Sequence, residues 1–481
     1  MLRAKLEPPA LKATTPSSQA VSHFLQEDES EKHPDNNNDT QDNQTCSISR
    51  PHKKSREKKM AKSAKLNDLT TTLSADIQSN STKSESQPTA KIAPKKPSTA
   101  ASKTAWMTKD TDRVLQTIQH DSLQPHDSSI SSVGGFDVLC TYNWQIDGKA
   151  ICVPGSPPRW LPLTLPVTLS PDSGLQYIDR NASHVPQYPF EPAFRALAIM
   201  NPDIPLDDTD IIANRNSFRK LLDFAAGKRQ DPFRMDLHLI NKTLFLSRKE
   251  RNARMMIHGA ANSGYGHNLE KAFTQPAAGL DRSSSHHRVI RYRIGPLTCL
   301  VRFEVDGYYD ASSEASPPHS EVDNLAASMA DLAVKKPTRA RAPKPSQTRV
   351  LERGTLIPSA KLAEIKAHKT EKINDATPQL WFGRTPYLIT GQHKQGVVHT
   401  VSCTNVAPRF GAWEEANQER LRKMVSVLVE LRNVMNREAV EAAVLVRQEK
   451  GGPLRVFGMK RAGSVLPESI VKRHWKEKGS E

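Results

Sequence analysis

One stretch constrains the fold more than any other: residues 288–306, RVIRYRIGPLTCLVRFEVD, have the pattern of a β-hairpin. Gly295-Pro296 is typical of a turn, and the side chains of each flanking strand alternate between two faces. The second strand therefore has an apolar face, Leu297, Cys299, Val301, Phe303 and Val305, and a polar face, Arg302, Glu304 and Asp306. Charged groups at the end of a core strand are costly unless they are paired. The hairpin predicts a metal site or, alternatively, an edge strand with a solvated face.

A second predicted strand, residues 361–367, carries a related polar face. Glu364 and Lys366 share one side of it, whereas Ala363 and Ile365 point to the other. Glu-x-Lys alone is more typical of a surface ion pair, but acidic residues on one strand followed by Glu-x-Lys on a neighbour are typical of metal-dependent phosphodiesterases. The carboxylates would hold Mg²⁺ or Mn²⁺, which lowers the pKa of a bound water. The lysine would orient that water or neutralise developing charge.

Composition limits the partners and the compartment. The chain has 481 residues and a formal net charge of +16, a basic surplus that favours a polyanionic partner such as nucleic acid. Five scattered cysteines without a C-x-x-C pair form neither a zinc site nor a disulfide framework, and they indicate a reducing compartment. No apolar run approaches the roughly 20 residues of a membrane helix, so we expect no membrane partner.

The same composition divides the chain into regions. Residues 1–133 are rich in Ser, Thr, Asn, Asp, Lys and Pro and have few aromatics, which predicts a disordered tail. Its basic run at 52–59 is either a nuclear-import signal or a solvated cluster. Residues 134–460 form the predicted folded domain, which a disordered insertion at 311–357 interrupts. Residues 461–481 form a basic C-terminal tail.

Hydrophobic periodicity predicts a mixture of strands and helices. Strands are expected at 136–144, 150–153, 235–240, 243–247, 387–391, 396–402 and 454–459, and helices at 191–200, 214–226, 264–272 and 413–447. The longest helix carries an apolar stripe typical of a core face. His286 and His287 precede the hairpin, but adjacent residues of a strand point to opposite faces, so joint metal ligation is not expected.

Taken in order, these pieces resemble the decapping-exonuclease family (DXO and its yeast Rai-type relatives). The family pattern is an arginine motif followed by G-x-x-Φ-E, E-Φ-D and E-Φ-K, where Φ is apolar. The corresponding residues are Arg215, Gly266–Glu270, Glu304–Asp306 and Glu364–Lys366. Two further segments are similar, one around Gln379 and the other at Gly451-Gly452-Pro453, and the similarity extends over residues 136–460.

The resemblance implies an α/β (α+β) fold with two mixed β-sheets flanked by helices, a core like that of PD-(D/E)-x-K nucleases, and a pocket between the sheets. It implies Mg²⁺ (or Mn²⁺) as cofactor, with Glu270, Glu304, Asp306, Glu364 and the backbone carbonyl of Ile365 as ligands. Asp306 and Glu364 would take part in catalysis with Lys366 and Gln379, which would lie near the attacking water and the scissile phosphate. Arg215 and Gln379 would bind the substrate.

The implied activity is metal-dependent hydrolysis of RNA 5′ ends, by removal of incomplete or non-canonical caps or of pyrophosphate, with 5′–3′ exoribonuclease activity in some relatives. The 5′ ends of RNA are then the partner, in mRNA quality control in the nucleus, with the cytoplasm as the alternative location. A 5′–3′ exoribonuclease as a protein partner stays open. Two other interpretations remain: a catalytically inactive nuclease fold that binds nucleic acid or serves as a scaffold, and a DNA nuclease of the same fold.

Overall fold

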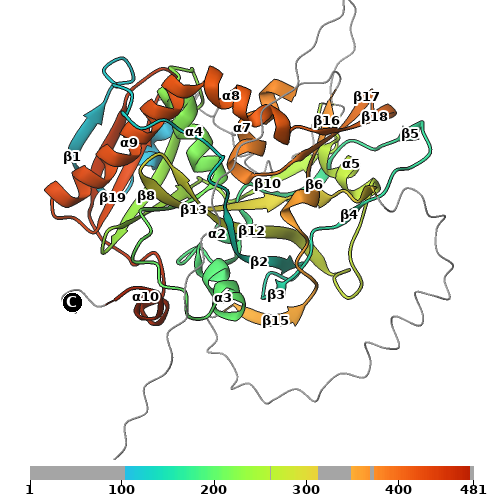
Figure 1. Ribbon diagram of the computed structural model, residues 1–481, viewed down its shortest axis with the longest axis horizontal. Helices are drawn as coiled ribbons and strands as arrows, with labels where there is room; N and C mark the ends of the chain where they lie inside the picture. The colour runs from blue at the N-terminus through green and yellow to red at the C-terminus, as the bar shows by residue number, and fades with distance from the viewer. Residues whose placement is uncertain (1–102, 261, 312–347, 369–372, 477–481) are drawn as a thin grey trace, which may run out of the picture. The chain divides into compact units, whose positions relative to one another are not determined.

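The computed structural model describes residues 103–260, 262–311, 348–368 and 373–476. All of them belong to the second of two units, residues 93–481, into which the contacts divide the chain. The predicted α/β class with two large mixed sheets flanked by helices is confirmed in this part of the chain (Figure 1). Among the described helices, none is both long and apolar enough to span a bilayer.

The larger sheet has eleven strands among the described residues, in the spatial order β1-β20-β19-β8-β9-β7-β13-β12-β2-β3-β15. In chain order they are β1 (Thr111–Ile118), β2 (Asp137–Gln145), β3 (Ala150–Pro154), β7 (Ile211–Asn214), β8 (Phe233–Ile240), β9 (Thr243–Lys249), β12 (Ser283–Ile294), β13 (Leu297–Val305), β15 (Arg349–Arg353), β19 (Ala442–Arg447) and β20 (Leu454–Met459). The predicted hairpin is the antiparallel β12–β13 pair. On its other side β13 pairs in parallel with β7.

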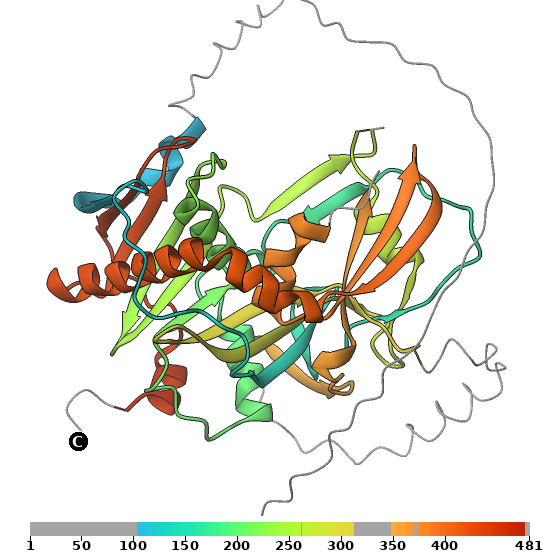
Figure 2. The ribbon, with the colours of Figure 1, turned by 45° about the horizontal axis from the view of Figure 1, so that its top comes forward.

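The smaller sheet has seven strands within the described ranges, in the order β11-β4-β14-β16-β17-β18-β5. They are β4 (Arg159–Trp160), β5 (Val167–Thr168), β11 (Thr274–Gln275), β14 (Gly307–Tyr308), β16 (Leu362–His368), β17 (Tyr387–Lys394) and β18 (Val397–Asn405). A separate two-stranded sheet pairs β6 (Ser173–Tyr177) with β10 (Arg254–His258) (Figure 2, blue-green and light green). Because β13 ends at Val305 and β14 begins at Gly307, only Asp306 separates a strand of one large sheet from a strand of the other.

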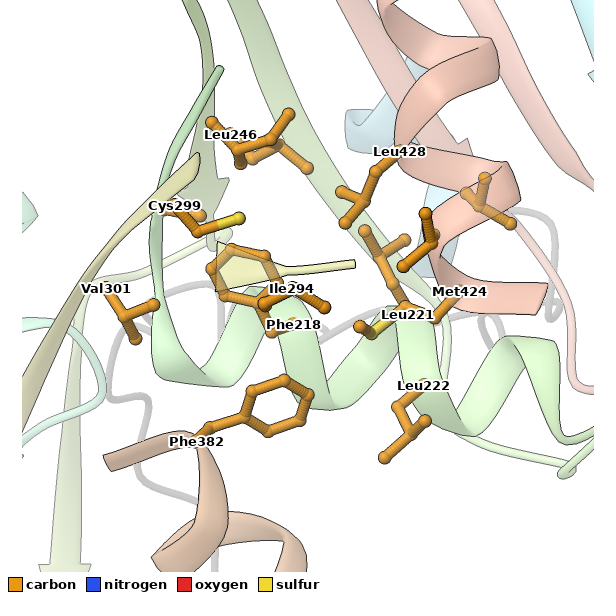
Figure 3. Packing of buried hydrophobic residues seen from close by; sticks show 14 of the residues in the cluster. Phe218, Leu221, Leu222, Leu246, Ile294, Cys299, Val301, Phe382, Met424 and Leu428 are labelled. Atoms are coloured by element: carbon orange, nitrogen blue, oxygen red, sulfur yellow. The ribbon is translucent and has the colours of Figure 1, made fainter. Parts of the chain in front are cut away.

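Helices pack on both faces of the larger sheet. The α-helices are α2 (Arg180–His184), α3 (Glu191–Met200), α4 (Arg215–Ala225), α5 (Gly266–Ala272), α7 (Ile373–Gly383), α8 (Phe410–Ala416), α9 (Gln418–Arg437) and α10 (Glu468–His474). Alternation along β13 sends Val301 into a core shared with α4, α7 and α9 (Figure 3), and sends Leu300 into a second core shared with α3 and the residues around α10. In α4, Phe218, Leu221 and Leu222 are buried against the first core, as the helical spacing predicts.

The prediction of a disordered tail at 1–133 is wrong for the part that the structure describes. Residues 103–118 include the short 3₁₀ helix η1 (Ala105–Thr108) and strand β1, which pairs antiparallel with β20 at the edge of the larger sheet. Most β1 side chains are exposed or only half-buried. An edge strand is held largely by backbone hydrogen bonds, so its composition resembles that of a tail. Residues 1–102 lie outside the described residues.

The prediction of one helix at 413–447 is also wrong. The segment contains α8, α9 and strand β19, and the chain turns between α9 and β19 at Ala439, whose φ is +52°. All residues of β19 are buried, and the strand pairs with β8 on one side and β20 on the other. A continuous apolar run suits a strand that is covered on both faces. The predicted apolar stripe lies on α9 and faces the first core: Leu421, Met424, Val425, Leu428, Leu431 and Met435.

Two further predicted irregular regions contain ordered elements. Part of the insertion predicted at 311–357 is β15, which pairs in parallel with β3; residues 312–347 lie outside the described residues. Part of the tail predicted at 461–481 is α10. The Trp475 ring after this helix contacts Phe194 and Phe245, and its indole N–H donates to Thr243 Oγ1 at 2.9 Å. These buried contacts explain why the basic segment packs on the sheet.

We expect Trp475→Ala to lower the free energy of unfolding by about 3–5 kcal/mol, as for other buried tryptophans. Trp475 is 4% exposed, so the substitution leaves a cavity and removes one hydrogen bond to Thr243. Urea denaturation of the full chain measures the change. Lys472→Ala on the exposed side of α10 is the control and should change it by less than about 0.5 kcal/mol. Equal midpoints for Trp475→Ala and the unsubstituted protein would contradict the docking of α10.

Candidate functional site

Asp306 lies at the joint of the two large sheets. The next residue, Gly307, begins β14. This strand pairs antiparallel with β16, and Gly307 lies opposite Ala363. This register places Asp306 beside Glu364 and Ile365, and the backbone N–H of Ile365 donates to Asp306 Oδ2 at 3.0 Å. The polar face that the sequence predicted for the end of β13 is therefore at a junction of two sheets and not at a free sheet edge.

Glu364 on β16 is the most enclosed carboxylate of this group, at 2% exposed. Arg215, the first residue of α4, donates from Nη1 to Glu364 Oε2 at 3.1 Å. Lys366 Nζ and the side-chain amide of Gln379 both donate to Glu364 Oε1. Lys366 Nζ also lies 3.4 Å from Asp306 Oδ2. The structure thus brings Arg215, Lys366 and Gln379 together around one carboxylate, while the roles that the resemblance implies for them stay predictions.

Glu270 reaches the same region from α5. The carboxylate of Asp172 accepts from the backbone N–H groups of His267 and Asn268 at the start of this short helix, at 3.2 and 2.9 Å. Leu269 is fully buried against the smaller sheet, which directs the neighbouring Glu270 toward the joint. Glu270 lines the same cavity as Glu304 and Asp306, and the charges of these two groups and of Glu364 act on its pKa.

The pKa values of these groups reflect their crowding. Burial, followed by the charge of Asp306, raises the pKa of Glu270 to about 9. Burial and then the charge of Glu364 raise the pKa of Asp306 to about 7. The carboxyl of Glu304 is accessible to water, but the enclosing walls reduce its solvation and raise its pKa. Burial also opposes ionisation of Glu364, yet Lys366 and Arg215 outweigh it and lower the pKa of Glu364 to about 2.

The donor set fits a divalent cation in kind. Within the described ranges no three His, Cys, Asp or Glu side chains are disposed as a ready-made metal site. Carboxylate oxygens are nevertheless the ligands that Mg²⁺ and Mn²⁺ prefer. Burial, and then the charge of neighbouring carboxylates, raise the pKa values of Glu270 and Asp306 and so disfavour their ionised forms. A divalent cation held by Glu270, Glu304, Asp306 and Glu364 would favour the ionised forms again. The backbone N–H of Ile365 donates to Asp306 and so holds Ile365 beside the carboxylates. The role of its backbone carbonyl as a metal ligand stays a prediction.

Two cavities flank the carboxylates and share Arg180 and Glu304 as lining residues. The first, of about 200 Å³, is here called the arginine cavity because Arg180, Arg215, Arg219, Arg248 and Arg302 line it. The second, of about 530 Å³, is here called the serine cavity because Ser156, Ser283, Ser284 and Ser285 line it, together with Glu270 and Asp306. One side of the carboxylates thus offers cationic groups and the other offers neutral hydroxyl groups.

Sequence reasoning missed two arginines of the site. Arg219 Nη1 donates to Gln379 Oε1 at 2.8 Å. Because it follows Arg215 by four residues on α4, the two lie on the same helix face, and this spacing was the available signal. Arg180 stacks on Tyr177, 4.2 Å from the ring centroid, and its charge opposes the burial that raises the pKa of Glu304. No spacing in the sequence connects Arg180 to the motifs.

Other polar residues near the hairpin have structural roles. Arg302 donates from Nε to Asn214 Oδ1 at 2.8 Å and lies 4.4 Å from the centroid of the Phe190 ring, which holds the start of α4 beside β13. His286 Nδ1 donates to Asn143 Oδ1 at 2.6 Å, whereas His287 stacks on Tyr142. The two histidines thus have different partners, as expected for adjacent strand residues.

Comparisons with known proteins identify the family. No curated protein matches the sequence. Among solved structures, the chain is similar to S. pombe Rai1 (11% identity, 71% of this chain and 98% of that one, TM-score 0.46). It is also similar to Scheffersomyces stipitis Rai1 in complex with (3'-NADP)+ and calcium ion (10% identity, 75% and 97%, TM-score 0.47) and to Candida albicans Rai1 in complex with pU5-Mn2+ (13% identity, 75% and 98%, TM-score 0.45). A family model described as "Domain of unknown function (DUF8563)" matches residues 112–475, and the chain belongs to this family.

Proposed function

We propose that this chain is a divalent-metal-dependent hydrolase of RNA 5′ ends, which removes an incomplete or non-canonical cap or a pyrophosphate. The observation that carries the proposal is the acidic cluster at the joint of the two sheets: Lys366 pairs with both Glu364 and Asp306, and Glu270, Glu304 and Asp306 line the adjoining serine cavity. The motif order that resembles the decapping exonucleases supports the same chemistry. The net charge of +16 suits a polyanionic substrate.

The chain's own residues would divide the work around the reacting phosphate. A bound divalent cation would supply a water of lowered pKa and neutralise phosphoryl charge. Lys366 would orient that water or neutralise developing charge from its place between Glu364 and Asp306. Glu364, kept ionised by Lys366 and Arg215, would act as a ligand. Gln379 is held against Glu364 by hydrogen bonding on both sides of its amide.

The two cavities would separate the parts of the substrate. The arginine cavity would hold the phosphate groups of the 5′ end, because guanidinium groups bind phosphate oxygens in a planar, bidentate manner. The serine cavity would hold the nucleoside of a departing cap, since hydroxyl groups can form hydrogen bonds with the ribose and with the edges of the base. Arg180 and Glu304, which line both cavities, would mark the boundary between the two parts.

Asp306→Asn and Glu364→Gln should each lower kcat at least about 100-fold, the usual effect of removing one electrostatic group that stabilises a transition state. The measurement is release of pyrophosphate or cap from 5′-triphosphorylated and 5′-capped RNA in Mg²⁺ or Mn²⁺, with circular dichroism to show that each variant folds. Glu352→Gln, an exposed carboxylate on β15, is the matched control. Full activity of Asp306→Asn would reject the site.

The same assays separate the two rival functions. RNA binding without turnover would favour an inactive scaffold, and preference for DNA ends would favour a DNA nuclease.

Mn²⁺ should stabilise the unsubstituted protein against heat, by about 2.7 kcal/mol at 100 times its Kd. The reason is that the cation binds the folded carboxylate cluster and not the unfolded chain. Asp306→Asn should lose most of this shift in Tm, whereas Glu352→Gln should keep it. An undiminished shift in Asp306→Asn would place the cation elsewhere.

Without metal, stability should fall as pH rises from about 5 to 9. The pKa of Glu270 is raised by folding, so the protonated carboxyl stabilises the fold below its unfolded pKa, and this stabilisation is lost as pH rises through about 9. Glu270→Gln should flatten this profile in EDTA and raise Tm at pH 8 by about 2–4 °C per kcal/mol gained. Glu415→Gln, exposed on α8, should keep the original slope. An unchanged slope in Glu270→Gln would contradict its placement among the carboxylates.

A further inference from the structure

A third cavity lies outside the carboxylate site. Its volume is about 800 Å³, and it is bounded by α4, α7, α8 and the start of α9. We call it the helical groove. The lining residues that carry the argument are Arg219, Lys228, Arg409, Trp413 and Arg420. None of the sequence motifs assigns a role to it.

An aromatic ring and a guanidinium group form a stack in the helical groove. The guanidinium carbon of Arg420 lies 5.3 Å from the centroid of the Trp413 ring. Trp413 in turn contacts Trp381 of the first core, with ring centroids 5.3 Å apart. Among the described residues, the buried Nε of Arg420 has no hydrogen-bond partner. The stack is therefore anchored from below by the first core.

The charge of the helical groove is positive. Its lining includes four cations, Arg219, Lys228, Arg409 and Arg420, and two acids, Asp223 and Asp375. Lys228 is paired with Asp223 at 2.9 Å. Arg409 is exposed, and it lies in the turn η4 (Ala407–Arg409) just before the helix that carries Trp413. An anion with a flat ring would meet both kinds of group at this place.

Arg219 connects the helical groove to the proposed site, because it lines both the groove and the arginine cavity. Arg219 donates a hydrogen bond to Gln379, and Gln379 donates one to Glu364, so two hydrogen bonds connect Arg219 to the proposed site. A ligand that extended from the arginine cavity past Arg219 would reach the helical groove. A nucleic-acid strand has this form, since it continues from its 5′ phosphate as alternating phosphates and bases.

We propose that the helical groove binds the single-stranded RNA that follows the 5′ end, with a base on the Arg420–Trp413 stack and a phosphate at Arg409. This inference rests on the proposed function for the placement of the RNA 5′ end in the arginine cavity. Binding of RNA in the helical groove does not itself require catalysis. Bases of single-stranded RNA stack on aromatic rings and on guanidinium planes, and cationic groups follow the backbone. An acidic peptide would satisfy the cations but would leave the stack without a partner.

The test uses the full chain in EDTA and a 3′-fluorescein-labelled, 5′-hydroxyl uridine 12-mer, with binding measured by fluorescence anisotropy. Trp413→Leu should weaken binding at least about fivefold, the lower limit for losing one base–aromatic stack. Arg409→Glu should also weaken binding, because it replaces a cation at the phosphate with a carboxylate. Trp413→Phe should retain most of it, because phenylalanine still presents a ring. Arg293→Glu, an exposed arginine on β12, makes the same charge change elsewhere and should have a smaller effect than Arg409→Glu.

Two outcomes would overturn the proposal. One is an unchanged Kd for both Trp413→Leu and Arg409→Glu; Arg409→Glu is at an exposed position, so its result stands even if Trp413→Leu fails to fold. The other is displacement of the RNA by a glutamate 12-mer as readily as by unlabelled uridine 12-mer, which would indicate a site for any polyanion. Failure of the proposed function is a separate result, since 5′-end hydrolysis can be absent while these variants still weaken binding.

Discussion

The hydrogen bond from the backbone N–H of Ile365 to Asp306 ties the two large sheets together where the chain passes from one to the other. Strand β14 must pair closely with β16 for this bond to form. A Cβ atom at Gly307 would lie 3.2 Å from both Ile365 Cδ1 and the Pro158 carbonyl oxygen, so a larger residue would be tightly packed at this crossing. Once this register is set, Glu304, Asp306 and Glu364 lie near one another without further adjustment of the backbone.

The closeness of these carboxylates has an electrostatic cost, and the surrounding fold offsets part of it. Buried charges are tolerated when they are paired and hydrogen-bonded. Glu364 meets this condition fully, with Arg215, Lys366 and Gln379 as partners. Glu270 and Asp306 meet it less completely, and their pKa values are raised. The fold therefore holds two carboxyl groups whose ionised forms lack full compensation, and a bound cation would supply the missing compensation.

The sequence predicts this part of the protein well because strand alternation is a local property. Period-two patterns at 297–306 and 361–367 identify the acidic faces, and the motif order links them to Glu270 and Arg215. Elements outside the site are harder to predict. An apolar run such as Ala442–Arg447 suits a helix and a buried strand equally in sequence terms, and only its pairing with β8 and β20 decides between them. Strand β1 carries too few apolar side chains to be distinguished from a tail.

Helix α4 explains how the first core controls the chemistry of the site. Burial of Phe218, Leu221 and Leu222 fixes the rotation of the helix about its axis, so Arg215 and Arg219 must face the arginine cavity. Arginine can only donate hydrogen bonds. Arg219 therefore requires the carbonyl oxygen of the Gln379 amide, which leaves the amide nitrogen to bind Glu364. In this way apolar packing on one side of a helix sets which atoms of Gln379 point toward the proposed catalytic carboxylate on the other.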